Sequence, residues 1–157
     1  MSKTSFLTHH SLLITHYLLL MPFSARITVR FGDADPAGLV YYPVLFHYCH
    51  VAMEEFFAAH CGISYQKLMA DERIGFPTVN AQAEFFVPFV YGDEVDVEVS
   101  VSRTGRSSAT FEYRLSRARD RVLCARATLV QVSMNLNERR AVPIPERYRK
   151  AFAASAE

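Results

Sequence analysis

The stretch "GDADPAGLVYYP", residues 32–43, joins a predicted strand to a predicted long helix. The residues before it, 25–31 ("ARITVRF"), alternate apolar and polar side chains and are rich in β-branched ones, as is typical of a strand. The run Asp-Pro-Ala-Gly has the residues that a type I turn prefers, with Asp35 at its first corner. Pro43 suits the first turn of a helix, and the apolar pattern continues to about His60. The stretch therefore predicts a strand, a tight bend and a helix.

The helix predicted over residues 43–60 is apolar around most of its circumference, and only His47, His50 and Glu54 form a thin polar line. Such a helix is expected to be buried on several sides. A short helix is predicted around residues 64–69. Four strands are predicted after it, over residues 77–90, 94–103, 107–117 and 122–135. One strand, one long helix and four meandering strands predict an α+β fold, in which a curved antiparallel sheet of about five strands wraps round the helix.

The composition of the 157-residue chain is that of one globular domain, with 50% hydrophobic and 21% charged residues. Its three cysteines have no regular spacing, which favours reduced thiols and a cytoplasmic protein. Residues 101–150 hold 12 Lys and Arg against 4 Asp and Glu, but no clustered basic run. Nucleic-acid binding is therefore not predicted, and solvated strand faces or a small phosphorylated ligand explain these arginines.

Residues 1–22 contain an apolar segment that is interrupted by His16 and Tyr17. It is shorter than the roughly 20 apolar residues that a spanning helix needs, so no membrane partner is expected. We interpret it as an N-terminal extension from an over-extended start, with a secretory signal as the alternative. We expect a single domain over residues 23–157, and we expect a chain that starts at Met21 to fold and to be active.

Three segments together resemble one family: residues 32–43, the aromatic helix after them, and residues 75–95 ("GFPTVNAQAEFFVPFVYGDEV"). The chain is similar to the hotdog-fold thioesterases, specifically the 4-hydroxybenzoyl-CoA thioesterase family, from about residue 25 to residue 148. The resemblance implies that Asp35 is the catalytic carboxylate and that the backbone N–H of Tyr42 holds the thioester carbonyl. It also implies active sites between the subunits of a homodimer, which often pairs into a homotetramer, and no cofactor beyond the CoA of the substrate.

The chemistry of thioester hydrolysis agrees with these two roles. One carboxylate can act on a thioester as nucleophile or as general base for water, and the sequence leaves both open. A helix N-terminus offers free N–H groups and a positive dipole end to the oxyanion. Asp35 could instead only shape its turn, but the resemblance favours catalysis. For Asp33 a local hydrogen bond or salt bridge is predicted.

The family resemblance also suggests substrate-binding positions, namely His50, Phe76 and Pro77. In the 4-hydroxybenzoyl branch of the family, the residue at the position of His50 is an acid that hydrogen-bonds the ring hydroxyl of the substrate. The preference for a 4-hydroxybenzoyl group is therefore not carried over to this chain. An aryl or a short to medium aliphatic acyl group is compatible with the sequence.

CoA-binding residues are implied beside the turn Thr104-Gly105. In the family, basic and hydroxyl side chains in this region contact the nucleotide phosphates, and Arg103, Arg106 and Ser108 match them here. The alternative is an ordinary polar hairpin tip. Glu84 is interpreted as a salt-bridge partner.

Three alternatives compete with thioester hydrolysis. His47, His50 and Glu54 share a helix face, but the polar edge of a buried helix explains them better than a metal site, so no metal is expected. A non-catalytic acyl-CoA-binding protein is the main alternative function. A hotdog dehydratase is disfavoured because no histidine directly precedes Phe76.

Overall fold

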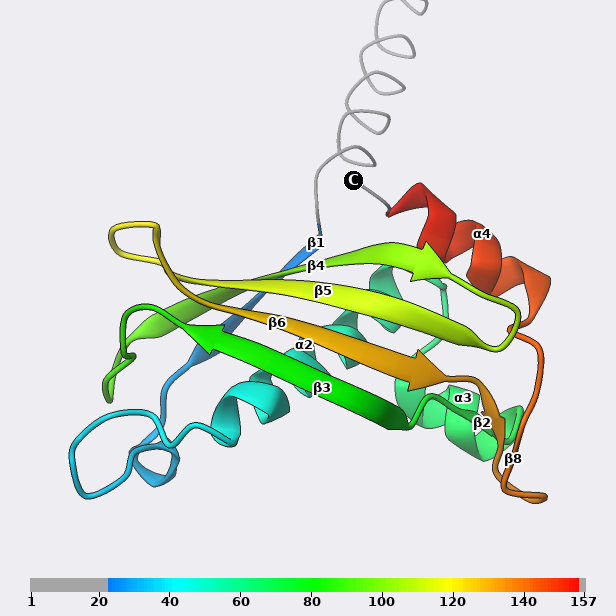
Figure 1. Ribbon diagram of the computed structural model, residues 1–157, viewed down its shortest axis with the longest axis horizontal. Helices are drawn as coiled ribbons and strands as arrows, with labels where there is room; N and C mark the ends of the chain where they lie inside the picture. The colour runs from blue at the N-terminus through cyan, green and yellow to red at the C-terminus, as the bar shows by residue number, and fades with distance from the viewer. Residues whose placement is uncertain (1–22, 156–157) are drawn as a thin grey trace, which may run out of the picture.

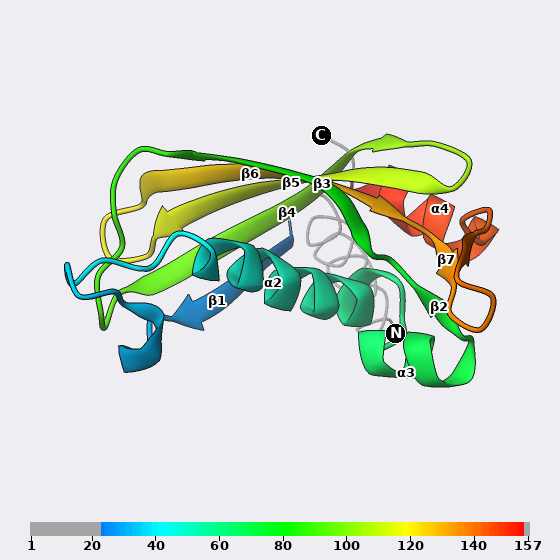
Figure 2. The same cartoon turned by 60° about the horizontal axis from the view of Figure 1, so that its bottom comes forward.

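One long helix lies against a curved antiparallel sheet (Figures 1 and 2). The structure is a computed structural model that describes residues 23–155, so the expectations for residues 1–22 lie outside the described residues. The elements are β1 (Phe23–Thr28), the 3-10 helix η1 (Phe31–Asp33), α2 (Val44–His60), α3 (Tyr65–Asp71), β2 (Ile74–Gly75), β3 (Thr78–Phe85), β4 (Glu94–Thr104), β5 (Ser108–Arg117), β6 (Val122–Val132), β7 (Met134–Asn135), β8 (Arg140–Ala141) and α4 (Glu146–Ala154). The predicted α+β class with a five-stranded sheet is confirmed.

The main sheet has the strand order β1-β4-β5-β6-β3, and every neighbouring pair is antiparallel. The predicted meander is wrong in one respect, because β3 pairs with β6 and not with β4. The chain after β3 crosses the end of the sheet instead of turning back, and there Val90 bridges to Leu39. As a result, β3 lies at one edge of the sheet, with most of its side chains exposed.

The core lies between α2 and the concave face of the sheet. Strand β4 alternates buried and partly exposed residues, as its sequence predicted, and it turns Val95, Val97 and Val99 inward. The buried residues of α2 are Leu45, Tyr48, Cys49, Ala52, Met53, Phe56 and Phe57. The opposite side of α2 is open to solvent in the single chain, so the expected burial on several sides does not occur within one subunit.

The last predicted strand ends at Val132 and not at Asn135, and two further strand ends differ next to the loop that carries Asp35. The first strand ends at Thr28, not at Phe31, because residues 31–33 turn into η1. The strand predicted over residues 77–90 stops at Phe85, the last residue of the regular pairing with β6. Both changes shorten a strand next to the loop that carries Asp35.

Helix α4 was not predicted, and it closes the open end of the core. Its Phe152 ring lies 5.8 Å from Phe57 and 5.4 Å from Phe111 between ring centroids. Tyr148, one turn earlier, is buried and donates a hydrogen bond to Glu72 at 2.8 Å. The C-terminal segment is therefore part of the domain core.

Among residues 23–155, no helix combines the length and apolar character that crossing a bilayer requires. The three cysteines are free thiols.

Candidate active site

Residues 29–42 form the loop between β1 and α2, which carries the predicted catalytic carboxylate. The Val29 N–H donates to the Asp93 carbonyl at 2.8 Å and ties the start of the loop to the residue before β4. The Val40 N–H donates to the Phe89 carbonyl at 2.9 Å and ties its end to the segment after β3. Because both limbs are held by backbone hydrogen bonds, the bend between them has a defined position.

The predicted turn at Asp35 is present. The Gly38 N–H donates to the Asp35 carbonyl at 2.9 Å, and Gly38 has a φ of 79°, in the left-handed region that favours glycine. The Ala37 N–H donates to Oδ1 of Asp35 at 2.8 Å, so this carboxylate also shapes its own turn. Within residues 23–155, Oδ2 of Asp35 has no hydrogen-bond partner. One oxygen therefore orients the group and leaves the other available for chemistry.

The start of α2 leaves one backbone donor free. The Tyr41 and Tyr42 carbonyls accept the N–H groups of Val44 (2.9 Å) and Leu45 (3.3 Å), and Pro43 has no N–H. No acceptor for the Tyr42 N–H is found among the described residues. The donor lies at the positive end of a helix of 17 residues, where a developing negative charge is stabilised. This geometry suits the predicted role of Tyr42.

Asp35 and Tyr42 line the same pocket, which has a volume of about 460 Å³. Its walls are mostly apolar: Leu45 lies on the α2 side, and Phe86 and Phe89 lie on the side of β3. Among the described residues that line it, Asp35 is the one carboxylate. An apolar wall lowers the local dielectric and strengthens the interaction of a carboxylate and a helix terminus with a reacting carbonyl.

The wall on the side of β3 was missed by the sequence analysis. The N–H groups of Phe86 and Val87 donate to the Cys124 carbonyl at 2.8 and 3.2 Å, which holds the wall against β6. The signal was present in the run "FFVPF" (residues 85–89), where a proline stops regular strand pairing inside an aromatic cluster.

The three predicted substrate-binding residues do not line this pocket within the single chain. His50 lies on the exposed side of α2, with Nε2 3.0 Å from the Glu54 carboxylate. Phe76 is 1% exposed and packs in the aromatic core 5.2 Å from Phe57, whereas Pro77 is exposed. Among the described residues no cluster of His, Cys, Asp and Glu could hold a metal ion.

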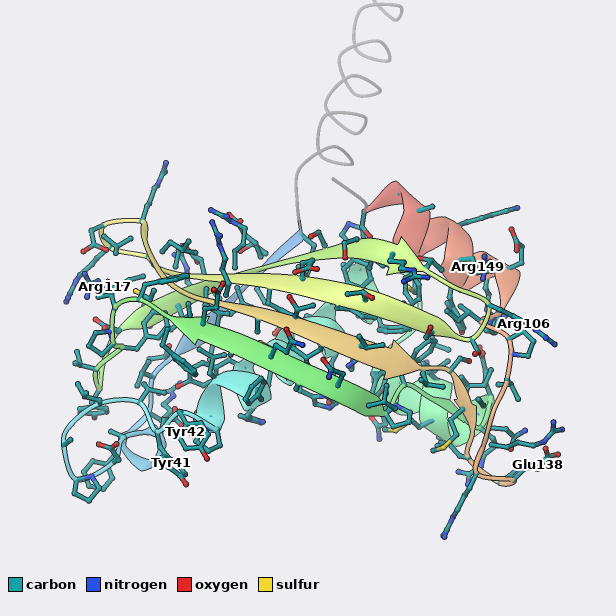
Figure 3. The ribbon with its side chains drawn as sticks, in the orientation of Figure 1. Tyr41, Tyr42, Arg106, Arg117, Glu138 and Arg149 are labelled. Atoms are coloured by element: carbon teal, nitrogen blue, oxygen red, sulfur yellow. The ribbon has the colours of Figure 1, made fainter. Side chains whose placement is uncertain are left out.

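The predicted CoA-binding residues lie at the other end of the sheet. Arg103, Arg106 and Ser108 surround the β4–β5 hairpin tip, which Figure 3 shows far from Tyr42. Ser108 pairs with Val132, at the end of β6 remote from the pocket. The eight residue-to-residue steps from Cys124 to Val132 correspond to roughly 26 Å at about 3.3 Å per residue.

The hairpin tip is attached to the C-terminal segment. The Ile144 N–H donates to the Arg106 carbonyl at 2.9 Å, and the Arg149 guanidinium donates to the Gly105 carbonyl. Arg106 itself is exposed. A single subunit therefore keeps Asp35 and the predicted phosphate-binding residues apart.

Solved structures with this architecture define the class of protein. A crystal structure of a 1,4-dihydroxy-2-naphthoyl-CoA thioesterase from Synechocystis has a TM-score of 0.76 and 28% identity, and covers 85% of this chain and 96% of its own. A gentisyl-coenzyme A thioesterase has a TM-score of 0.73 and 29% identity, and covers 83% and 98%. The fold is therefore that of the hotdog thioesterases, as the sequence predicted.

Sequence comparison identifies the family. Residues 29–152 match the thioesterase-like superfamily. A 1,4-dihydroxy-2-naphthoyl-CoA hydrolase from Synechococcus elongatus is 33% identical over 120 residues, which are 76% of this chain and 86% of that protein. The chain belongs to the thioesterase-like superfamily, and it is an enzyme of the thioester hydrolase class.

Proposed function

We propose that this protein hydrolyses acyl-CoA thioesters to a free acid and CoA. The observation that carries the proposal is the joint position of the Asp35 carboxylate and the free Tyr42 N–H in one apolar pocket. The Tyr42 N–H stabilises the oxyanion that forms from the thioester carbonyl. Asp35 either activates a water molecule that adds to the carbonyl, or attacks the carbonyl itself and forms an anhydride that water then hydrolyses to the free acid; in both routes CoA leaves as its thiolate. The reaction as proposed uses water and no cofactor.

We propose an aryl acyl group in place of a short or medium aliphatic one. Aromatic side chains line the pocket on both sides, including Tyr41, Phe86 and Phe89. Such walls favour planar ring systems through offset or edge-to-face packing. The relatives named above act on dihydroxynaphthoyl-CoA and gentisyl-CoA, which are both hydroxylated aryl thioesters.

A panel of CoA esters tests the function and the acyl class together. We expect release of CoA thiol from naphthoyl- and benzoyl-CoA derivatives with a kcat/KM at least about tenfold above that for hexanoyl- or octanoyl-CoA. Contacts with the ring that stabilise the transition state by roughly 1.4 kcal/mol give that ratio. Equal rates on alkyl esters would contradict the aryl preference. Binding of all esters without thiol release would support the non-catalytic alternative.

We propose that the complete site forms in a homodimer through β3, and that such dimers pair into tetramers. An open edge strand offers unpaired backbone groups to a second copy. Strand β3 runs from Thr78 at the hairpin end to Phe85 at the pocket end. Antiparallel pairing of two copies puts the hairpin end of one subunit beside the pocket of the other, so the partner's Arg103, Arg106 and Ser108 approach the CoA there.

The double substitution Ala81→Asp with Gln82→Asp tests this dimer. Both side chains are exposed in the middle of β3, where an antiparallel two-fold pair brings like residues together. Like charges facing each other are destabilising, and we expect the dimer dissociation constant to rise at least about tenfold. Sedimentation velocity measures it, and activity per chain should fall as monomer accumulates.

The matched control for the dimer test is Gln66→Asp with Lys67→Asp on α3, where both residues are exposed. It should leave both assembly and activity unchanged. An unchanged dimer in the β3 variant would contradict the proposed interface.

We also propose a cytoplasmic location, which the three free thiols support.

A further inference from the structure

Asp33, two residues before Asp35, connects three parts of the site at one point. Its Oδ2 accepts the Arg30 N–H at 2.7 Å and the Tyr48 hydroxyl at 2.8 Å. Its carbonyl accepts the Tyr41 N–H at 2.8 Å. The contacts come from the residues before the bend, from the residues after it and from α2. The side chain predicted to make a local hydrogen bond therefore also bonds to a residue 15 positions away.

These bonds reach the neighbours of both proposed catalytic groups. Asp33 is separated from Asp35 by one residue, and its partner Tyr41 directly precedes Tyr42. Tyr48 lies in the second turn of α2 and is 2% exposed. Core packing therefore fixes the position of the Tyr48 side chain that donates to Asp33. A shift of Asp33 would therefore move the carboxylate and the N–H donor relative to each other.

The Tyr48 hydroxyl remains a donor throughout the neutral pH range. Burial raises the pKa of Tyr48 above its ordinary value, and the hydrogen bond to the Asp33 carboxylate raises it further. The hydroxyl is therefore protonated at neutral pH and can donate to the Asp33 carboxylate.

Asp33 and Tyr48 do not line the pocket that contains Asp35 and Tyr42. They line a separate groove of about 350 Å³ between β1 and α2, together with Arg30, His47 and Glu55. Neither side chain is placed to contact the reacting carbonyl, so any effect on turnover must pass through the loop. The structure thus distinguishes their role from that of Asp35.

We propose that Asp33 and Tyr48 are positioning residues, whose hydrogen bond sets the distance and angle between the Asp35 carboxylate and the Tyr42 N–H. The inference rests on the proposed function, since it assumes that those two groups carry out the reaction. Misplacement of a reacting group by about 1 Å can lower the rate on the order of 100-fold. Loss of the hydrogen bond between Asp33 and Tyr48 is expected to have an effect of up to this size.

The geometry distinguishes the alanine and asparagine variants. A single oxygen of Asp33 accepts both side-chain contacts, so an asparagine carbonyl in the same place can accept both, whereas alanine removes them. We expect Asp33→Ala to lower kcat by about 10- to 100-fold with KM nearly unchanged. We expect Asp33→Asn to stay within about threefold of the native kcat, because it keeps the geometry without the charge.

Tyr48→Phe supplies the second half of a double-mutant cycle. It removes the hydroxyl and keeps the buried ring, and we expect kcat to fall by about 3- to 10-fold. The Asp33→Ala, Tyr48→Phe double variant should be no slower than Asp33→Ala alone, since both changes remove the same bond. Turnover is measured per folded chain, well below each variant's Tm, together with the affinity for a non-hydrolysable thioether analogue of the CoA ester.

The outcomes separate this inference from the proposed function. A native kcat in Asp33→Ala, a loss that only follows the folded fraction, an additive double variant, or an asparagine variant as slow as alanine would each overturn the positioning role. Asp35→Asn is assayed in parallel. If that variant turns over normally, the proposed function itself fails, whatever Asp33 does.

Discussion

Replacing Asp35 with asparagine is expected to lower kcat by about two to four orders of magnitude while folding and binding of CoA esters persist. Asparagine keeps the size of the side chain, and its carbonyl can accept the Ala37 N–H as Oδ1 of Asp35 does, so the turn is retained. It lacks the negative oxygen that could attack a thioester or take a proton from water. The loss should therefore appear in kcat and kcat/KM together.

The measurement is steady-state release of CoA from the best ester, with Tm and analogue affinity determined on the same preparations. Asp33→Asn is the matched control, because it makes the same chemical change two residues away. Near-native turnover in Asp35→Asn would remove Asp35 from the mechanism. A large fall in Tm would show that the carboxylate is needed for its turn.

Replacing Phe57 with alanine is expected to lower the free energy of unfolding by about 3–5 kcal/mol, the usual cost of deleting a buried aromatic ring. Phe57 is fully buried on α2, and its ring centroid lies 5.2 Å from that of Phe76 and 5.4 Å from that of Tyr65. The rings come from α2, α3 and the chain beside β3, so a cavity here loosens several elements together.

Urea unfolding at one fixed protein concentration measures the effect, since any dimerisation contributes to the apparent stability. Phe31→Ala is the control, because this ring is 84% exposed and the same atoms are removed from water instead of from the core. We expect it to change the free energy of unfolding by less than about 0.5 kcal/mol. A loss below about 1 kcal/mol at Phe57 would contradict its place in the core.

The parts of the fold that depend on local patterns were predictable from the sequence. Strand β4 follows from alternation of period two, and the bend at Asp35 follows from turn residues whose preferences are set within four positions. Helix α2 follows from a long apolar run that begins next to a proline. In each case the physical determinant lies inside the segment itself.

The parts that depend on distant contacts were not predictable in this way. Pairing of β3 with β6 joins Thr78 to Gln131, and no local pattern selects that partner over β4. Helix α4 gains its stability from Phe152 in an aromatic core assembled from other elements, whereas a helix of its length is marginal in isolation. The pocket shows the same division: Asp35 lies in a local sequence motif, but Phe86 becomes a wall residue only because its N–H bonds to Cys124 of the distant strand β6.

The wall that follows β3 has a consequence for how the specificity of this enzyme can change. Its backbone is held by the Phe86 and Val87 N–H groups on the Cys124 carbonyl, and these bonds do not depend on which side chains the wall carries. The Phe85 and Phe86 side chains are half exposed in the single chain, so the core of one subunit fixes neither of them. New side chains can therefore replace them on an unchanged scaffold. Under the proposed function, mutation of these residues would resize the cavity for another acyl group while the carboxylate and the helix terminus stay in place, so selectivity would evolve separately from catalysis.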